Sequence, residues 1–333
     1  MQKEWIARIL VFLLVPVAIG VPVLGWWNRS QGVVVHAQMA ETGGWNPDNL
    51  TVEAGQPLHL RLTSDDVAHS FAIGQSDRPV VDVLPGETTE VTLVFDRPGK
   101  YTFYCTRWCS VNHWRMRGTI EITTPGSQPA SETIKPPLYV RLGLDIDAEH
   151  HAKILPDQKP SVARGAVFRA LISPTYLTRE YYLSHTPEQA WRALRGETSL
   201  QALSDQELWD LTAFIWNTNI TSKELEEGRE LFIANCAACH GESGKGDGVF
   251  ADDLSSYVNI QESDHSQPSG LNKASPADFS DPEHMLSTSS AHLQGKIIRG
   301  GMGTGMPYWG PIFTEEQTWA LVAYLWTFQS EQE

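Results

Sequence analysis

Cysteine is scarce in this chain, because only four of its 333 residues are cysteine. The four fall into two close pairs, Cys105 with Cys109 and Cys236 with Cys239. Each pair lies in a motif that also contains histidine, so no cysteine is left over for a disulfide that would cross-link the fold. Cysteine usage therefore points to bound cofactors.

Positive charge is also in short supply. The chain has 25 Lys and Arg against 40 Asp and Glu, which gives a formal net charge of -15. Such a chain is a poor match for nucleic acid. The acidity has two possible roles: it attracts a basic partner protein, or it keeps an exported protein soluble. No general acid, nucleophile or substrate pocket is legible, so we expect the chain itself to carry out no bond chemistry.

The remaining composition is that of a folded protein of several domains. A length of 333 residues allows two or three domains of ordinary size. Hydrophobic residues make up 41% of the chain and include twelve tryptophans, which is enough to bury sizeable cores.

The stretch YTFYCTRWCSVNHWRMRGTI gathers Cys105, Cys109, His113 and Met116. Residues typical of strands flank it, so we expect these four side chains on a loop between two strands. Thiolate, imidazole and thioether together favour copper. A second cysteine exceeds the needs of a mononuclear blue-copper site, since two thiolates can bridge a pair of copper ions. Each ion then needs its own imidazole, and His69 in DDVAHSFAI is the best candidate for the second.

The pattern C-x3-C-x3-H-x2-M with an upstream H-S-F resembles the cupredoxin domain of cytochrome c oxidase subunit II, which carries the binuclear CuA centre. The resemblance covers residues 33–123. It implies two bridging thiolates, one imidazole for each ion, an axial thioether and an axial backbone carbonyl, supplied by Cys105, Cys109, His69, His113, Met116 and Arg107.

Two residues depart from the usual oxidase pattern. Arg107 stands where oxidases usually carry an acidic or amide side chain, and Ser110 where they usually have glycine. A carbonyl ligand tolerates any side chain, so copper binding survives the arginine, while docking onto an ordinary oxidase becomes doubtful. Nitrous oxide reductase, whose copper domain resembles this one, often has a C-T-x-x-C-S sequence there.

The cysteine pair also allows two alternatives to copper. Cys105 and Cys109 could form a disulfide in an exported domain, but that leaves His113, Met116 and His69 unexplained. A zinc site is the second alternative, and it would not require a methionine.

The N-terminal segment predicts a membrane anchor over residues 1–31. Lys3 and Arg8 precede an apolar run from Ile9 to Trp27 that is long enough to cross a bilayer. We therefore expect a single-pass protein of a bacterial cytoplasmic membrane, with its N-terminus in the cytoplasm and its main domains on the outer face. A cleavable signal peptide is the alternative.

Short β-rich runs alternate with turn signals from Gly32 to Thr124, which predicts an all-β cupredoxin sandwich of about seven strands or more over residues 32–124. His36 and His59 lack a liganding context there and are expected to be structural or exposed. A linker rich in Pro, Ser and Gly follows at residues 125–135.

Beyond the linker the periodicity becomes helical, and one segment repeats another. LSDQELWDLTAFIW at residues 203–216 matches FTEEQTWALVAYLW at 313–326, and WRALRGE at 191–197 parallels GKIIRGG at 295–301. This is an internal repeat of a helical module. We accordingly expect all-α domains at residues 136–221 and 222–333.

Only the second copy carries CAACH, residues 236–240, and C-x-x-C-H in an exported chain is the attachment motif of a c-type haem. With GESGKGDG after it and GTGMPYWG before the last helix, residues 222–330 resemble a class I cytochrome c domain. That resemblance implies thioether links from Cys236 and Cys239, His240 as the proximal ligand and Met306 as the sixth ligand, with Met302 as the competitor.

The first copy has no cysteine and no methionine, so it cannot hold a c-type haem in the usual way. We interpret it as a degenerate cytochrome c-like domain, the alternative being an unrelated helical spacer. The polar stretch Asp252–Ala274 is expected to be a long surface loop of the haem domain.

Together these features predict a membrane-anchored electron-transfer subunit that relays single electrons between haem c and CuA. The expected recipient is the catalytic subunit of a haem-copper oxidase or nitric oxide reductase, and the expected donor is a quinol-oxidising complex or a soluble cytochrome. One alternative is a dedicated donor to a separate reductase such as nitrous oxide reductase. Another is a copper-delivery protein, which predicts a labile, exposed site and gives no reason for the haem.

Overall fold

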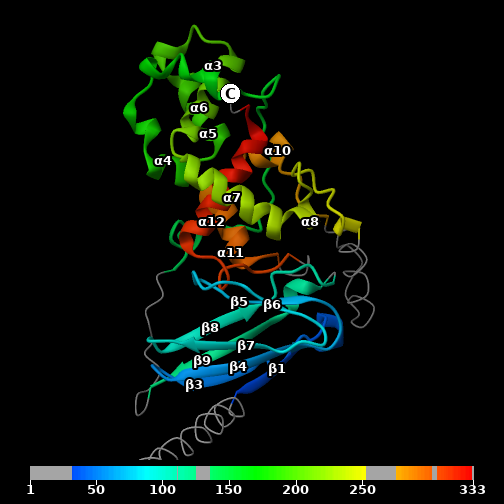
Figure 1. Cartoon of the computed structure of the whole chain (residues 1–333). Helices are drawn as coiled ribbons and strands as arrows, with labels where there is room; N and C mark the ends of the chain where they lie inside the picture. The colour runs from blue at the N-terminus through cyan, green and yellow to red at the C-terminus, as the bar shows by residue number, and fades with distance from the viewer. Residues whose placement is uncertain (1–31, 111, 125–135, 253–274, 302–305, 332–333) are drawn as a thin grey trace, which may run out of the picture. The chain divides into compact units, whose positions relative to one another are not determined.

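The computed structural model describes residues 32–110, 112–124, 136–252, 275–301 and 306–331 (Figure 1). The chain divides into two compact units, and the main division falls after Ser131. The first unit is made of strands and the second of helices. An all-β region followed by an all-α region agrees with the order that the sequence predicts.

The predicted membrane anchor is wrong as a feature of this fold. Within the described ranges, no helix is both long enough and apolar enough to cross a membrane. Residues 1–31, on which that prediction rested, lie outside the described residues. An apolar run shows a preference for apolar surroundings but does not by itself establish a spanning helix. The transmembrane helix is therefore removed from the fold class, and the single-pass membrane location is withdrawn with it.

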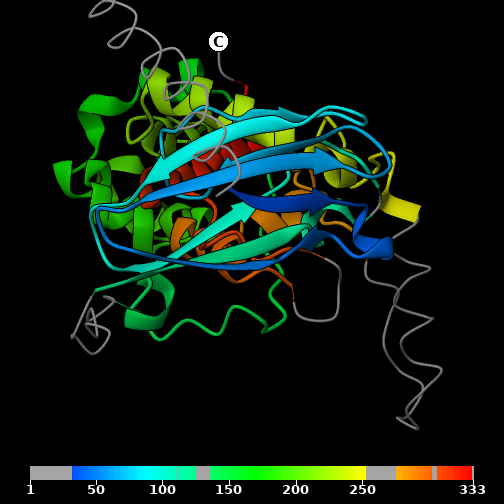
Figure 2. The ribbon, with the colours of Figure 1, turned by 60° about the horizontal axis from the view of Figure 1, so that its bottom comes forward.

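The β unit is a sandwich of two sheets, one ordered β2-β1-β4-β7 and the other β3-β9-β8-β5-β6. Figure 2 shows the strands of this unit running side by side. Two strand pairs are parallel, β1 with β4 and β3 with β9. The strands, with two 3₁₀ turns between them, are β1 Val33–Ala37, η1 Ala40–Thr42, β2 Trp45–Asn46, β3 Asn49–Glu53, β4 Pro57–Ser64, β5 His69–Ile73, β6 Val81–Val83, β7 Thr89–Val94, β8 Gly99–Tyr104, η2 His113–Arg115 and β9 Arg117–Thr123.

The core of the sandwich follows from alternation along the strands. In β4 every second side chain is buried, including Leu58, Leu60 and Leu62, as expected where one face of a strand meets the core. The strand β5 is buried at all five positions. Cys105 and Met116 belong to the same apolar cluster. The predicted site therefore borders directly on the packed core, which limits how far its side chains can move.

The second unit consists of short helices and 3₁₀ turns. We call residues 136–221 the haem-free half and residues 222–331 the haem half. The haem-free half contains α2 Leu138–Arg141, α3 Val162–Ala166, η3 Arg169–Leu171, η4 Pro174–Leu177, α4 Arg179–Ser184, α5 Pro187–Gly196, η5 Thr198–Leu200 and α6 Asp205–Asn217. The haem half contains α7 Ser222–Asn235, α8 Ala237–His240, α10 Pro282–Met285, α11 Ser290–Arg299, α12 Glu315–Trp326 and η6 Thr327–Gln329.

The principal helices begin where the sequence supplies a capping box. Thr186, Ser204, Thr221 and Thr314 each accept the backbone N–H three residues on, while the Glu or Gln at that position caps in return. Each box satisfies two backbone donors that would otherwise lack partners at the helix start. The four boxes fix the starts of α5, α6, α7 and α12.

The two halves share one helix crossing. In the haem half α7 crosses α12, and a Cβ on Gly228 would collide with the backbone oxygen of Ala320. In the haem-free half α3 crosses α6, and a Cβ on Gly165 would collide with the backbone oxygen of Asp210. When the matching segments 203–216 and 313–326 are aligned, Asp210 and Ala320 occupy the same position. The structural correspondence thus extends from single helices to a helix pair.

Equivalent residues also meet where the halves touch. Trp216 near the end of α6 and Trp326 at the end of α12 are aligned in the repeat, and their rings lie edge to face with centroids 6.0 Å apart. A contact between equivalent positions is the mark of approximate twofold packing. In this unit the haem-free half occupies the place of a second copy of the haem half.

Candidate copper and haem sites

The copper residues lie where β8 turns back into β9. The loop leaves β8 at Cys105 and closes through the bond from the Cys105 N–H to the Met116 carbonyl, 3.1 Å. The Trp45 indole N–H donates to the same carbonyl at 3.1 Å. His69 comes from a neighbouring strand, where it is the first residue of β5. One strand and the connection between β8 and β9 therefore supply the predicted side chains.

The predicted side chains come together at this loop. The ligand atoms of His69, Cys105 and Cys109 lie within 4.8 Å of one another and could hold a metal ion. Cys105 Sγ lies 4.0 Å from His69 Nδ1. Met116 Sδ lies 3.3 Å from Cys109 Sγ. Two thiols, an imidazole and a thioether thus converge in a cluster of the size that one or two metal ions would fill.

The backbone oxygen of Arg107 also faces this cluster. It lies 3.3 Å from Cys105 Sγ, so it points to the inside of the loop. The Arg107 guanidinium points outward, where it pairs with Asp82 at 2.6 Å and is 47% exposed. The Arg107 carbonyl therefore faces the cluster while its side chain points away, as a carbonyl ligand requires. Although the arginine departs from the usual oxidase pattern, its side chain does not enter the site.

His69 is oriented by a carboxylate that sequence analysis missed. His69 is fully buried, and its Nε2 lies 2.7 Å from Asp66 Oδ1. Since a carboxylate accepts, Nε2 carries the proton and Nδ1 is free to face Cys105. Burial lowers the pKa of His69, but the bonds to Cys105 and Asp66 outweigh it and the net direction is upward. The spacing D-x-x-H was the only signal in the sequence.

Asp66 is in turn held as a carboxylate. Burial acts to raise its pKa, but the backbone N–H of Met39 and the side chain of His69 lower it further. The Met39 N–H donates to Oδ2 at 2.6 Å and the Val67 N–H to Oδ1 at 2.6 Å. The proton therefore stays on His69 Nε2, which keeps Nδ1 available to a metal.

His113 has a polar atom with no partner. It is 3% exposed, and its Nδ1 is buried without a hydrogen bond among the described residues. The Trp108 ring packs on the imidazole at 4.4 Å between centroids. A buried nitrogen without a partner is costly in an ordinary core. A metal ion would account for it, so the residues present fit copper.

The two thiols of the cluster share their protons unequally. The hydrogen bond with Cys109 holds the pKa of Cys105 well below its ordinary value, although burial acts to raise it. The pKa of Cys109 is raised by Cys105 and by burial. A second thiolate beside the first needs a cation between them. The electrostatics of the pair thus match two sulfurs that ionise together only around a metal.

The haem residues follow from the end of α7. The N–H of Cys236 bonds back to Phe232 at 2.8 Å, and the short helix α8 then carries Cys239 and His240. After α8 the glycine-rich loop folds back, with Gly246 N donating to His240 O at 2.8 Å and Gly248 N to Cys239 O at 3.1 Å. Gly248 lies so close to the Ala238 backbone that a side chain would not fit.

His240 is held by a segment that sequence analysis did not single out. Its Nδ1 donates to the Ala277 carbonyl at 3.0 Å, and the Phe279 ring stacks on the imidazole at 4.6 Å and 25°. Burial lowers the pKa of His240, against the Ala277 bond. A neutral imidazole with its proton on Nδ1 leaves Nε2 as a donor to iron. The residues therefore fit a haem on this histidine.

Met306 is joined to the end of α11 by backbone hydrogen bonds. The Gly301 N–H donates to its carbonyl at 3.2 Å, and the Trp309 N–H donates to Ile297 O at 3.1 Å, so the chain returns to the end of α11. Met302, the competing residue, lies outside the described residues. The stretch expected to be a surface loop, Asp252–Ala274, lies outside them too except for Asp252.

Two further histidines of the β unit behave as the sequence indicates. His36 pairs with Asp65 at 2.9 Å and His59 lies 3.0 Å from Thr92 Oγ1. Neither belongs to the metal cluster.

Comparison with known proteins agrees with both sites. The family model described as "Cytochrome C oxidase subunit II, periplasmic domain" matches residues 38–123, and the model described as "Cytochrome c" matches residues 225–329. Cytochrome c oxidase subunit 2 of Thermus thermophilus is 37% identical over 104 residues, which is 29% of this chain and 76% of that protein. Nitrous-oxide reductase of Ralstonia nicotianae is 37% identical over 70 residues, 20% of this chain but 11% of that protein.

Solved structures give a distant likeness. The periplasmic domain of subunit II of the Bradyrhizobium japonicum cytochrome oxidase aligns with 23% of this chain and 55% of its own, at 22% identity and a TM-score of 0.22. The assignment of this chain to a family therefore depends on the two family models and on the Thermus relative, and not on these structures. This chain has an electron-transfer role, binds copper as CuA and carries haem c, and it belongs to the cytochrome c oxidase subunit II family, with a C-terminal cytochrome c domain fused to the copper domain.

Proposed function

We propose that this chain relays single electrons between its haem c and its binuclear copper centre and passes them to the catalytic subunit of a haem-copper oxidase or nitric oxide reductase. The copper ligands are His69, Cys105, the Arg107 carbonyl, Cys109, His113 and Met116. The haem ligands are Cys236, Cys239, His240 and Met306.

The observation that carries the proposal is the closed copper site. His69, Cys105, His113 and Met116 are each at most 3% exposed, and the buried Nδ1 of His113 has no other partner among the described residues. No substrate can reach a metal in such a site, whereas an electron can. Both groups change oxidation state by one electron, and the protein's part is to hold their ligands still and exclude water.

The supporting residues hold protons in place. Asp66 keeps the proton on His69 Nε2, and Ala277 keeps the proton on His240 Nδ1. Each leaves one imidazole nitrogen directed at a metal. Because the two redox groups are on one chain, an electron need not wait for a second protein to diffuse in.

A dedicated donor to a separate reductase, such as nitrous oxide reductase, is the second candidate. The observation that favours it is the outward Arg107 side chain and its ion pair with Asp82, because an oxidase partner would meet a cation where an acidic or amide group is usual. Ser110 and the similarity to the Ralstonia enzyme favour the same partner. Copper delivery is disfavoured, because a donor of metal ions needs an accessible site.

The first test is the EPR and absorption spectrum of the full chain loaded with copper and haem. We expect one unpaired electron shared by two copper ions beside a low-spin haem. Cys109→Ser should abolish the shared signal and leave the haem spectrum unchanged, while Ser110→Ala, next to it, should keep both. A single-copper pattern in the unaltered chain would refute the binuclear assignment.

A matched pair of methionine variants tests the haem ligand. Met306→Leu should remove the sixth ligand and produce a high-spin or solvent-ligated haem, whereas Met302→Leu should keep the low-spin spectrum. The opposite result would exchange the two assignments. Purification of the tagged chain from its native cells then tests the partner: a many-helix catalytic subunit supports the oxidase, and its absence supports the separate reductase.

A further inference from the structure

The proximal histidine is clamped by one short segment of the haem half. Ala277 supplies the carbonyl that accepts from His240 Nδ1 at 3.0 Å, and Phe279 supplies the ring stacked on the imidazole at 4.6 Å. We call residues 276–279 the proximal clamp. A hydrogen bond to one nitrogen and a ring against one face fix both the tautomer and the orientation of the imidazole.

The proximal clamp is itself fastened at two points. The Phe279 N–H donates to Gly244 O at 2.6 Å, in the glycine-rich loop after the haem motif. The Phe279 carbonyl accepts from Gln329 Nε2 at 2.5 Å. Gln329 lies on η6 and is 7% exposed, and the neighbouring Phe328 ring stacks parallel to Phe279 at 6.3 Å. The clamp therefore depends on where η6 is held.

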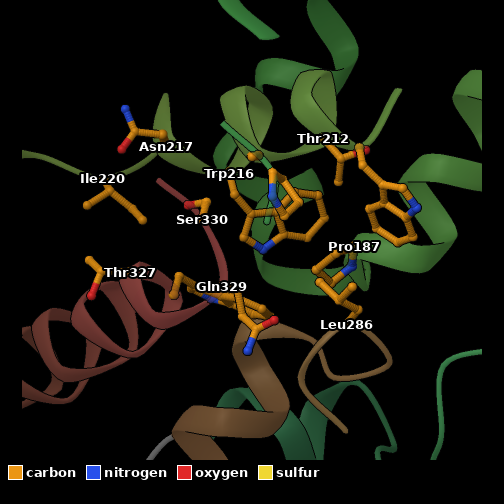
Figure 3. Close-up of a pocket in the computed structure, with 13 residues that line it drawn as sticks. Pro187, Thr212, Trp216, Asn217, Ile220, Leu286, Thr327, Gln329 and Ser330 are labelled. Atoms are coloured by element: carbon orange, nitrogen blue, oxygen red, sulfur yellow. The ribbon is translucent and has the colours of Figure 1, made fainter. Parts of the chain in front are cut away.

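After Gln329 the last described residues of the haem half pair with the haem-free half. The Glu331 N–H donates to Pro160 O at 2.8 Å, and the Val162 N–H donates to Glu331 O at 3.1 Å. The Glu331 carboxylate also lies 3.2 Å from Arg164. Figure 3 shows Gln329 and Ser330 beside Trp216 of the haem-free half, around the pocket that both halves line.

The repeat explains where this pairing occurs. In the haem-free half, α6 is followed directly along the chain by α7 of the haem half. In the haem half, the equivalent helix α12 is followed by Glu331, which is joined to the start of α3 by two backbone hydrogen bonds instead of by the chain. Terminal segments are poorly ordered unless they are tied down, and these two bonds hold the end of η6 against the haem-free half.

We propose that the haem-free half positions the haem's proximal ligand, acting through Glu331, Gln329 and Phe279 on His240. This rests on the proposed role of His240 as an iron ligand. The haem-free half then helps to fix the orientation of the proximal histidine, and Gln329 and Phe279 are positioning residues. Loss of the clamp weakens the Ala277 bond, makes His240 a poorer donor to ferric iron and raises the reduction potential of the haem.

The test uses the full chain loaded with haem and measures the haem potential. Phe279→Leu should raise the reduction potential of the haem, whereas Phe279→Tyr, which keeps the ring, should have the potential of the parent chain. A chain ended after Gln329 should shift it in the same direction by less, while a chain ended after Glu331 should not shift it. Ending the Phe279→Leu chain after Gln329 should add nothing further, because both changes act on one route.

Each result decides the matter. If the chain ended after Gln329 keeps the parent potential, or if its shift adds to that of Phe279→Leu, the haem-free half does not act through this route. Arg179→Gln is a further control, since Arg179 also joins the halves, through Glu224, but lies off the route and should leave the potential unchanged. Failure of the proposed function looks different, because the parent chain would then lack the low-spin haem spectrum.

Discussion

The haem half and the haem-free half use one helix crossing for two purposes. In each half a glycine lets one helix approach the backbone of the other closely: Gly228 of α7 lies on Ala320 of α12, and Gly165 of α3 lies on Asp210 of α6. After these glycine-bearing helices the halves diverge. In the haem half α7 leads through Cys236 into α8, which carries Cys239 and His240, whereas in the haem-free half α3 leads through η3 into η4, which carries Tyr176.

The two halves therefore share the helix crossing, and the segment that follows α7 or α3 decides whether a haem site is formed. In the haem-free half the space beside the crossing is packed with rings. Tyr176 is 9% exposed and bonds Glu197 at 2.9 Å, and Trp191 stacks on Trp209 at 5.8 Å. Aromatic side chains of this size bury as much surface as a core needs. A haem is therefore not required to complete that half.

The largest expected effect comes from filling the crossings. Gly228→Val places a side chain against the Ala320 backbone, which cannot move aside cheaply, and should cost about 3 kcal/mol or more of unfolding free energy. Gly165→Val should cost a similar amount. Only the first should also lower haem attachment. Thermal unfolding followed by circular dichroism and by haem absorbance measures both effects.

Gly196→Ala is the control for these variants. Gly196 is the last residue of α5, and among the described residues outside its own stretch of backbone none would lie within 4 Å of a Cβ there, so alanine should raise the free energy of unfolding by about 0.5–1 kcal/mol. If Gly165→Val melted at the temperature of the parent chain, the close contact of α3 with α6 would not stabilise the fold. The two halves would then not share a stabilising helix crossing.

A smaller effect is expected where the crossings differ in chemistry. Asp210 is 2% exposed and accepts from the Ser161 N–H at 2.8 Å and from Arg164 at 2.7 Å. Asp210→Ala copies the residue of the haem half but leaves the Ser161 donor buried and unpaired. We expect a loss of about 1–3 kcal/mol in urea unfolding. Asp157→Ala, at an exposed position of the same half, should change little. Equal stability of the two variants would contradict the assigned role.

The ring packing of the haem-free half gives a third, still smaller effect. Tyr176→Phe removes the bond to Glu197 and should cost about 1 kcal/mol. Tyr181→Phe should be neutral or stabilising, because the buried Tyr181 hydroxyl has no partner among the described residues. Urea unfolding of the two variants at neutral pH compares them directly. A larger loss for Tyr181→Phe would mean that its hydroxyl is satisfied by water.

How much of this could be predicted from the sequence depends on how local each feature is. Cys105, Cys109, His113 and Met116 lie within twelve residues, so their spacing alone indicated a metal loop between strands, and the structure brings Cys105 and Cys109 together with His69. The CAACH motif is just as local. The capping boxes are local as well, because each one is formed by two residues three positions apart.

Supporting groups could not be predicted, because the tertiary fold brings them in. Ala277 acts through a backbone carbonyl that any residue would supply, 37 positions after His240. Trp45 reaches the Met116 carbonyl across 71 positions. Neither leaves a pattern in the sequence. The anchor failed for the opposite reason: an apolar run is a strong local signal, but it reports a preference for apolar surroundings and not the structure that satisfies it.

The smallest expected effect concerns a link between the halves and is visible through pH. Asp147, in the segment before α3, pairs with Arg299 and Lys296 of α11, and the Arg299 hydrogen bond lowers its pKa from 3.8 to about 2. A lowered carboxyl pKa stabilises the fold above the unfolded value, and that contribution disappears as the pH falls from about 4 to about 2. Because the Asp147 side chain is 56% exposed, solvent screening limits the contribution to less than about 1 kcal/mol.

Asp147→Asn should therefore lower the melting temperature slightly at pH 7 and not at pH 2, while Asp157→Asn should follow the parent chain throughout. A difference between Asp147→Asn and the parent that persisted at pH 2 would show that the aspartate acts through packing rather than charge.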